Sequence, residues 1–332
     1  MAKGSASSPE RVKEFIQAVY DNDAARVSAM LNEGVDVNAS ESEDFTALHY
    51  AVWLGHKSVV KALLEYNPAM EVRTVTGLTP LVLAASNSHE DIAIMLLEKG
   101  ADPNFAEENG GRAIDRAAEN GLIRTLKELR ARGADIGPSQ EGKASPIMLA
   151  AYKGRLTAVK KLVSYGSDIH YRAKDGSTAL EGAMRNGHEN VFDYLVQQRA
   201  DVKAVGSGGF NLVMWGAIGN KPRMMKRLLK MKVPLEHLPN NSPLFIAAVM
   251  NYPDIARVAL EAGGDIDKRD VQNNTAHDVA IANDNHEIAA MIDAEADRRL
   301  LKAEVREITQ SVQKGVGPGL KRPKTANFKK TN

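Results

Sequence analysis

The chain has 332 residues and nearly balanced charge, with 43 Lys and Arg residues against 42 Asp and Glu residues. The net charge of +1 gives no overall field that would favour nucleic acid. The absence of cysteine excludes disulfide bonds and thiolate metal sites, and it suits a reducing compartment. No apolar run approaches the roughly 18 residues of a membrane-spanning helix, and the N-terminus lacks the apolar stretch of a secretion signal. We therefore expect a soluble, cytoplasmic protein.

The first part of the chain predicts a short polar segment followed by two helices. Residues 1–9 are small and polar, and we expect them to be disordered. The helices are expected at Glu10–Tyr20 and Ala24–Glu33, and Gly34 ends the second one. This pair lacks the Thr-Pro-Leu start that recurs later in the chain. We interpret it as an N-terminal cap, a repeat whose outer face meets water.

Residues 44–68 read as one complete structural unit of two short helices. Thr46 is placed to cap the first helix through its hydroxyl group, and Gly55 ends that helix after about two turns. Asn67 stands where a left-handed residue would end the second helix, and Pro68 cannot extend it. Two helices this short cannot bury their apolar faces alone, so the unit needs neighbours.

The same unit recurs with a period of 33 residues. Steps of 33 from Leu48 reach apolar residues as far as Val213, and only the step from Val213 to Leu244 is shorter, at 31 residues. The anchor residues of the nine predicted units are Phe15, Leu48, Leu81, Ile114, Ile147, Leu180, Val213, Leu244 and His277. Such a period is typical of stacked repeats, in which neighbouring units bury a continuous core.

Short motifs mark the start and the end of these units. Variants of one tetrapeptide open five of them: TALH at 46–49, TPLV at 79–82, SPIM at 145–148, TALE at 178–181 and SPLF at 242–245. Second helices end in Gly-Ala-Asp at 100–102 and at 133–135. In these motifs the chain resembles the ankyrin repeat family, whose units start with Thr-Pro-Leu-His. The resemblance implies an all-α solenoid of stacked helix-turn-helix units with β-turn fingers over residues 10–294.

Three units depart from the repeated pattern, with RAID at 112–115, NLVM at 211–214 and TAHD at 275–278, and the last of them suits a C-terminal cap that faces water. The unit anchored at Ile114 carries many charges of both signs, which we interpret as a solvated outer face, with a recognition patch for a charged partner as the alternative. Arg199 and Lys232 replace the glycine that ends other second helices, and glycine crowds the finger at 205–210. The stability of a repeat array is roughly the sum of the stabilities of its repeats and of the contacts between neighbouring repeats. We therefore expect 199–243, where these substitutions gather, to be the least stable part of the array.

Beyond the last unit, the sequence predicts an amphipathic helix over 295–314. Leu301, Val305, Ile308 and Val312 follow one another at helical spacing and form one apolar face. We expect this helix to fold back on the last repeat, and the alternative is a docking helix for a partner.

The remaining residues, 315–332, form a basic tail rich in glycine and proline, which we expect to be disordered. Lys321, Arg322 and Lys324 resemble a short nuclear-import signal, and such runs also attract nucleic acid or acidic surfaces. We interpret the tail as solubilising or flexible, with a targeting role as the alternative. Deleting the tail without changing location or partners would favour a simple scaffold.

No motif for catalysis, cofactors or metals emerges from the sequence. His56, His89 and His188 each lie eight residues after an anchor, and this recurrence indicates hydrogen bonds at the turn between helices. No H-E-x-x-H motif or nucleophile elbow occurs, and the glycines at 206–209 lack the strand that precedes a phosphate loop. We expect no enzyme activity, no cofactor and no metal site.

The resemblance implies that a partner protein binds the concave surface formed by the fingers and the exposed sides of the first helices. At the corresponding positions, the candidate residues are Phe45, Trp53, Leu54, Leu78, Tyr152, Lys153, Lys174, Asp175, Arg185 and Phe210. The alternative is that Trp53 and Leu54 pack between units, and Trp215 is expected in the core. The predicted function is a non-enzymatic protein-interaction scaffold. The alternative is a regulatory or host-directed factor whose basic tail finds the nucleus, nucleic acid or an acidic surface.

Overall fold

The computed structural model describes residues 8–41, 45–107, 110–236 and 242–313. The chain divides into two compact units, Met1–Leu238 and Pro239–Asn332. Over the described residues, eighteen α-helices follow one another, one short 3₁₀-helix interrupts them, and β-structure is limited to isolated bridges in the fingers. The predicted all-α solenoid is confirmed.

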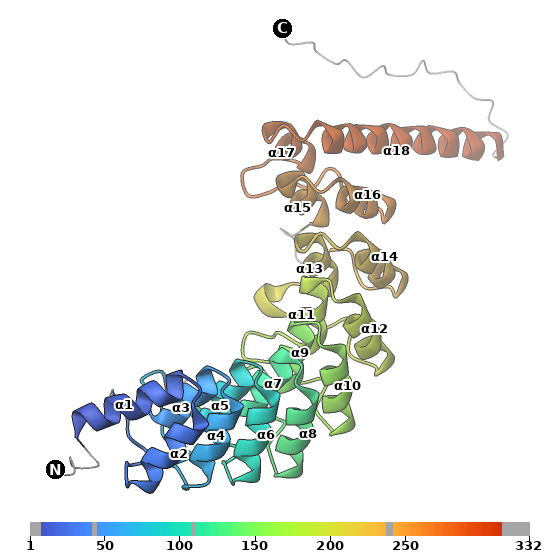
Figure 1. Cartoon of the computed structure of the whole chain (residues 1–332). Coiled ribbons are helices and arrows are strands. Elements are labelled where there is room, and N and C mark those ends of the chain that lie inside the picture. The colour runs from blue at the N-terminus through green and yellow to red at the C-terminus, as the bar shows by residue number, and fades with distance from the viewer. Residues whose placement is uncertain (1–7, 42–44, 108–109, 237–241, 314–332) are drawn as a thin grey trace. The chain divides into compact units, whose positions relative to one another are not determined.

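The first unit contains fourteen of these helices, arranged as successive pairs (Figure 1). The first helices of the pairs are α1 (Pro9–Tyr20), α3 (Ala47–Trp53), α5 (Pro80–Ser86), α7 (Ala113–Asn120), α9 (Pro146–Tyr152), α11 (Ala179–Asn186) and α13 (Leu212–Ile218). The second helices are α2 (Ala24–Asn32), α4 (Lys57–Leu64), α6 (Glu90–Glu98), α8 (Ile123–Ala131), α10 (Leu156–Ser164), α12 (Glu189–Gln197) and α14 (Pro222–Lys230). First helices from α1 to α13 pack against first helices, and second helices from α2 to α12 against second helices, so two layers share one core.

Local sequence explains where these helices start and end. Proline occupies the first position of α5, α9 and α14, where its missing N–H is not needed. The hydroxyls of Thr79 and Thr178 accept hydrogen bonds from the first turns of α5 and α11. Asn67, Arg199 and Lys232 take left-handed conformations after second helices, with φ of 50°, 67° and 61°. The left-handed conformation predicted for Asn67 is confirmed.

The anchor residues of the period lie in the core. From Phe15 to Leu244, each anchor is at most 2% exposed. His277 departs from this pattern: its side chain is 33% exposed, and its Nε2 lies 3.3 Å from a carboxylate oxygen of Asp293. The period therefore predicts burial correctly until the last unit, where a polar residue takes the anchor position.

The second unit contains α15 (Pro243–Met250), α16 (Pro253–Glu261), α17 (Ala276–Ala282) and α18 (His286–Gln313). α18 is one continuous helix across the expected boundary at residue 294, so residues 295–313 extend the helix of the last repeat instead of folding back on that repeat. A fold-back needs a turn, and no glycine or proline interrupts residues 286–313. Its apolar residues Leu301, Val305, Ile308 and Val312 are 54–62% exposed.

Candidate protein-binding surface

An aromatic groove lies between the fingers and the first helices near the N-terminus. Its volume is about 570 Å³. The residues that line this aromatic groove are Tyr20, Phe45, Tyr50, Trp53, Thr74, Val75, Thr76, Leu78 and Leu83. Three of the predicted partner-binding residues, Phe45, Trp53 and Leu78, are therefore brought together by the fold.

The rings of the aromatic groove contact one another. Phe45 meets Tyr50 edge-on with ring centroids 4.5 Å apart, and Tyr20 lies 4.9 Å from Tyr50. Burial, together with a hydrogen bond to Tyr50, raises the pKa of Tyr20 to about 12. Ring pairs of this kind are stabilised beyond their buried area, so the walls of the groove are formed before any partner arrives.

Trp53 leaves half of its surface in solvent. It is 51% exposed, so its ring does not pack between units as the alternative interpretation required. Its backbone carbonyl accepts hydrogen bonds from Asn87 and His89 of the next helix pair, which fixes the end of α3. Leu54 is half-buried at the end of α3 and does not line the aromatic groove.

A second, polar groove of about 170 Å³ lies further along the first unit. The residues that line this polar groove are Ala144, Met148, Leu149, Tyr152, Asp175, Ser177, Thr178, Glu181, Gly182 and Arg185. It collects three further predicted residues, Tyr152, Asp175 and Arg185. The two grooves share no lining residue, so these six predicted residues fall in two separate hollows.

Two of the charged side chains that line the polar groove, Asp175 and Arg185, are held in place. Hydrogen bonds from the hydroxyl and the backbone N–H of Ser177 lower the pKa of Asp175. The guanidinium of Arg185 lies 4.8 Å from the ring centre of Trp215. Trp215 is only 7% exposed, which confirms its predicted place in the core, and Phe210 packs edge-on against it at 5.4 Å. Phe210 therefore supports Arg185 through Trp215.

The two predicted lysines have different surroundings. Lys153 forms an ion pair with Glu119 at 3.3 Å. Lys174 lines a neighbouring hollow of about 550 Å³ with Arg172 and Glu141, and its backbone N–H donates to the carbonyl of Gly142. Neither lysine lines the polar or the aromatic groove.

Sequence reasoning missed Tyr20, Tyr50 and Val75 as groove residues. Tyr20 lies 33 residues before Trp53, at the same place in the repeat. Val75 lies in a finger, six residues before the anchor Leu81. Val75 is 82% exposed. The 33-residue period alone indicates Tyr20, but an interpretation of the first repeat as a cap does not include a binding role for it.

The charged unit around Ile114 differs from its predicted solvated face. Arg112 and Asp115 are 4% and 5% exposed, and the Arg112 Nε lies 3.1 Å from a carboxylate oxygen of Asp115. The Arg112 guanidinium also donates to the carbonyl of Gly137 at 2.6 Å. Burial raises the pKa of Asp115, against the opposing influence of Arg112. For this pair, both the solvated-face interpretation and the exposed recognition patch are wrong.

Arg112 and Asp115 occupy the positions that Thr46 and His49 hold in the repeat anchored at Leu48. The backbone N–H of Thr46 donates to Nδ1 of His49 at 3.2 Å, which leaves the proton on Nε2, and Nε2 donates to the carbonyl of Val72. In the charged unit, the backbone N–H of Arg112 donates to Asp115 instead. The ion pair thus replaces a neutral hydrogen-bonded pair in the same structural place.

The turn histidines bind the preceding helix pair through backbone carbonyls. His56 donates to Tyr20, His89 to Trp53 and His188 to Tyr152, at 3.2, 3.4 and 2.9 Å. Their predicted structural role is confirmed, although their acceptors lie in a neighbouring unit. Within the parts of the chain that the structure describes, no cluster of three or more His, Asp or Glu side chains is arranged to hold a metal ion.

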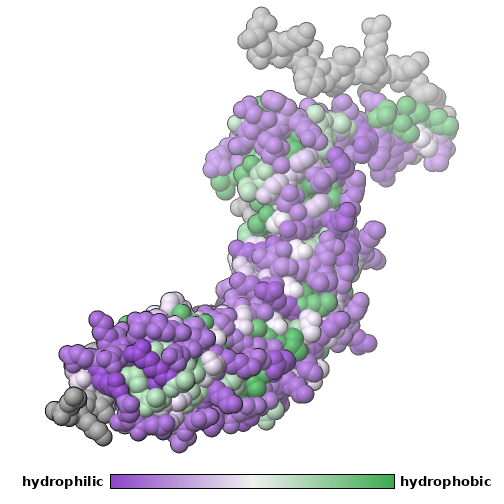
Figure 2. Space-filling view, in the orientation of Figure 1, coloured by the Kyte–Doolittle hydropathy of each residue, from purple (hydrophilic) through white to green (hydrophobic). Residues whose placement is uncertain are grey.

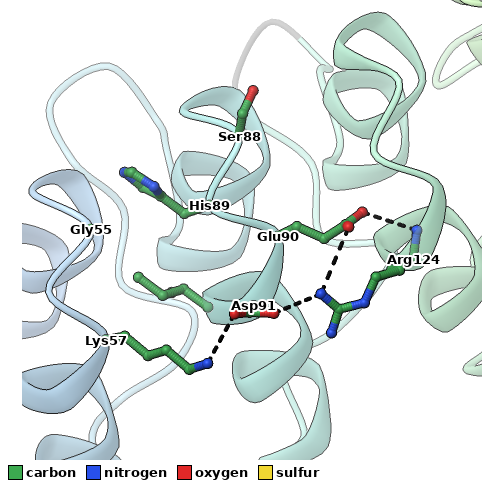
Figure 3. A pocket seen from close by; sticks show the side chains of 8 residues that line it. Gly55, Lys57, Ser88, His89, Glu90, Asp91 and Arg124 are labelled. Atoms are coloured by element: carbon green, nitrogen blue, oxygen red, sulfur yellow. Dashed lines mark hydrogen bonds and ion pairs between the residues drawn. The ribbon is translucent and has the colours of Figure 1, made fainter.

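A third hollow, of about 360 Å³, lies at the start of α6 (Figure 3). The carboxylate of Asp91 lies between Lys57 and Arg124, at 2.9 and 2.7 Å, and hydrogen bonds from these two side chains lower its pKa. The carboxylate of Glu90 accepts hydrogen bonds from the backbone N–H groups of Arg124 and Thr125. These contacts join three successive helix pairs and account for the acidic residues without catalysis.

Some predicted features lie outside the described residues. These are the N-terminal segment 1–7 and the basic tail with Lys321, Arg322 and Lys324. Over the described ranges, no helix combines the length and the apolar character needed to cross a membrane.

Known proteins resemble parts of this chain. An ankyrin repeat and KH domain-containing protein of Caenorhabditis briggsae is 45% identical over 78 residues, which are 23% of this chain and 3% of that protein. Protein phosphatase 1 regulatory subunit 27 of Mus musculus is 32% identical over 97 residues, which are 29% of this chain and 63% of that protein. The chain thus spans less than two thirds of the length of either relative.

A solved structure and a family model cover more of the chain. The human ASB11 ankyrin repeat domain superposes with a TM-score of 0.59 at 25% identity, over 66% of this chain and 98% of that one. The family model for ankyrin repeats, in three copies, matches residues 15–107 and 114–205. Because these two matches make up more than half of the sequence, the chain belongs to the ankyrin repeat family, whose repeats are protein–protein interaction modules.

Proposed function

We propose that this chain is a non-enzymatic scaffold that holds a partner protein against the aromatic groove and the polar groove. The observation that carries the proposal is the half-exposed indole of Trp53, which shares one groove with three other aromatic rings. Contiguous exposed apolar patches on soluble proteins mark interaction sites, and Trp, Tyr and Arg dominate binding energy at interfaces.

The two grooves suit different parts of a partner. The aromatic groove accepts apolar side chains, because Val75, Leu78 and the rings leave few polar atoms on its walls. The polar groove offers the carboxylate of Asp175 and the guanidinium of Arg185 to charged or hydrogen-bonding groups. Since Arg185 already rests on Trp215, it loses little rotamer freedom when a partner binds.

The experiment compares binding by the intact protein and by single alanine variants that circular dichroism shows to be folded. A partner isolated with the intact protein is titrated against Trp53→Ala, Arg185→Ala and a control, Tyr165→Ala. Tyr165 follows α10 and lines neither groove. We expect Trp53→Ala to weaken binding by roughly 2 kcal/mol, about thirtyfold, while the control binds normally. Equal affinities for Trp53→Ala and the intact protein would move the binding site away from the aromatic groove.

A further inference from the structure

Among the described residues of the second unit, the C-terminal half of α18 extends beyond its repeat with its side chains exposed. The first half of the helix buries Ile288, Ala289 and Ile292 and contacts α15, α16 and α17. From residue 300 to residue 310, every residue is exposed. Figure 1 shows this half of α18 continuing past α16 within the second unit. Helices gain most of their stability from packing of an amphipathic face, and among the described residues of the second unit nothing covers this face.

The exposed apolar residues of this half follow a heptad pattern. Leu301, Val305, Ile308 and Val312 are separated by four, three and four residues, which corresponds to positions d, a, d and a of a coiled-coil heptad. Their exposed fractions lie between 54% and 62%. Figure 2 shows a green patch close to the end of α18. Valine at both a positions, with leucine at one d position (Leu301) and isoleucine at the other (Ile308), is compatible with a parallel two-stranded coiled coil.

The charges beside this seam are complementary between two copies. In the same frame Asp297 occupies position g and Lys302 the following position e, the two positions that face each other across a parallel two-stranded coiled coil. Both side chains are exposed, and neither forms an ion pair within the described residues. Their neighbours Arg298 and Arg299, in contrast, are both paired with Glu295.

The next pair of flanking positions creates no repulsion. Glu304 at g would face Thr309 at e of the second copy, so no like charges meet at these two flanking positions. The surface of the helix also carries Asp297, Glu304 and Glu307 among its basic residues. Helices that lie on lipid surfaces instead have a polar face rich in Lys and Arg, so the charge pattern favours a protein partner.

We infer that the face formed by Leu301, Val305, Ile308 and Val312 binds the same face of a second copy of this chain, as a short parallel coiled coil. Two Asp297–Lys302 ion pairs, related by the twofold axis, set its register. Arg298 occupies the preceding a position and ends the seam on the N-terminal side. A seam of four apolar layers is short, so the association is reversible and depends on concentration.

The experiment is sedimentation velocity on the full chain, from micromolar to near-millimolar protein. The expected result is a reversible monomer–dimer equilibrium. Leu301→Asp is expected to raise the dimer dissociation constant more than about tenfold, because it places a charge in the seam. The matched control is Leu300→Asp, because Leu300 is 63% exposed and Leu301 is 62% exposed, but Leu300 lies at position c, outside the seam. The control is expected to dimerise like the unaltered chain.

Charge reversal tests the register. Asp297→Lys and Lys302→Glu should each weaken dimerisation, and the double variant should restore it, since the ion pairs re-form with exchanged signs. A chain that remains monomeric at every concentration overturns the inference, as do equal effects of Leu300→Asp and Leu301→Asp. A monomeric chain that binds anionic phospholipid vesicles through this face would also overturn it and assign the face to membranes.

Discussion

A carboxylate oxygen of Glu90, at the start of α6, lies 2.9 Å from the backbone nitrogen of Arg124 in the first turn of α8. The same oxygen accepts from the backbone N–H of Thr125 at 3.1 Å. Helix α8 begins after Leu122, whose side chain has no acceptor for these groups. One helix pair therefore supplies the N-terminal cap of the next.

We expect Glu90→Ala to lower the free energy of unfolding by about 1 kcal/mol, the usual value of a lost N-cap. Urea unfolding followed by circular dichroism measures this change. Glu98→Ala is the control, because Glu98 is exposed at the other end of α6 and caps nothing. If both variants lose the same stability, the loss at Glu90 does not come from the cap.

The buried ion pair of Arg112 and Asp115 predicts a large effect of a single substitution. Asp115→Ala leaves the Arg112 guanidinium buried with only the carbonyl of Gly137 and Asp135, at 3.5 Å, as partners. We expect a loss of about 3 kcal/mol in unfolding free energy, since a broken buried pair leaves an uncompensated charge. Thermal and urea unfolding measure the loss.

A double variant separates this explanation from simple loss of packing. Arg112→Thr combined with Asp115→His recreates the pair formed by Thr46 and His49 in the repeat anchored at Leu48. We expect the double variant to be more stable than Asp115→Ala. A double variant as unstable as the single one would show that the unpaired charge is not the cause.

His49 makes the stability of the array depend on pH. Burial lowers the pKa of His49 below the value of 6.5 that it has in an unfolded chain. The folded state therefore binds fewer protons than the unfolded state at mildly acidic pH, and stability falls as the pH drops below about 6.5. The full contribution is present above that pH. A His49→Met variant should be less stable at neutral pH and show a shallower loss between pH 7 and pH 5 in urea titrations.

The two tryptophans should respond differently to truncation. Trp53 is 51% exposed, and we expect Trp53→Ala to cost no more than about 1 kcal/mol of unfolding free energy. Trp215 is 7% exposed and supports Arg185, and we expect Trp215→Ala to cost about 3 kcal/mol or more. Chemical unfolding of both variants checks this. Similar losses would mean that Trp53 is a packing residue.

In the stretch 199–243, residues other than glycine adopt the left-handed backbone conformation. Lys232 has φ of 61° at a place where glycine follows most other second helices, so Lys232→Gly should raise the free energy of unfolding by about 1 kcal/mol. Gly166→Ala is the opposite substitution and should lower the free energy of unfolding, because φ is 91° at Gly166. An added Cβ would meet no atom within 4 Å, so only the backbone conformation is tested. Native-state hydrogen exchange tests the wider prediction, and uniform protection across 199–243 and its neighbours would contradict it.

The sequence predicted the elements that depend on period and local chemistry. The spacing from Phe15 to Leu244 placed buried anchors, and Asn67 marked the left-handed end of a second helix. Within the candidate site, the same frame placed Phe45, Trp53 and Leu78 together.

The remaining features depend on contacts between units, which one sequence does not display. A run of mixed charge is usually solvated, so the burial of Arg112 and Asp115 became visible only with Asp135 and Gly137 beside them. Similarly, Glu90 is favourable at the start of its own helix, and its bonds to the next helix appear only in three dimensions. The separation of Tyr152 from the aromatic groove also follows from packing and not from spacing.

The turn histidines have a consequence for synthesis on the ribosome. His56, His89 and His188 each donate to a carbonyl that precedes them in the chain. The acceptor therefore leaves the ribosome first, and each newly emerged turn finds its partner already in place. In contrast, His49 donates to the carbonyl of Val72, which follows it in the chain, so this finger contact forms only after the next repeat has been synthesised. A nascent array would thus grow in one direction, with only its most recent finger unsatisfied at any time.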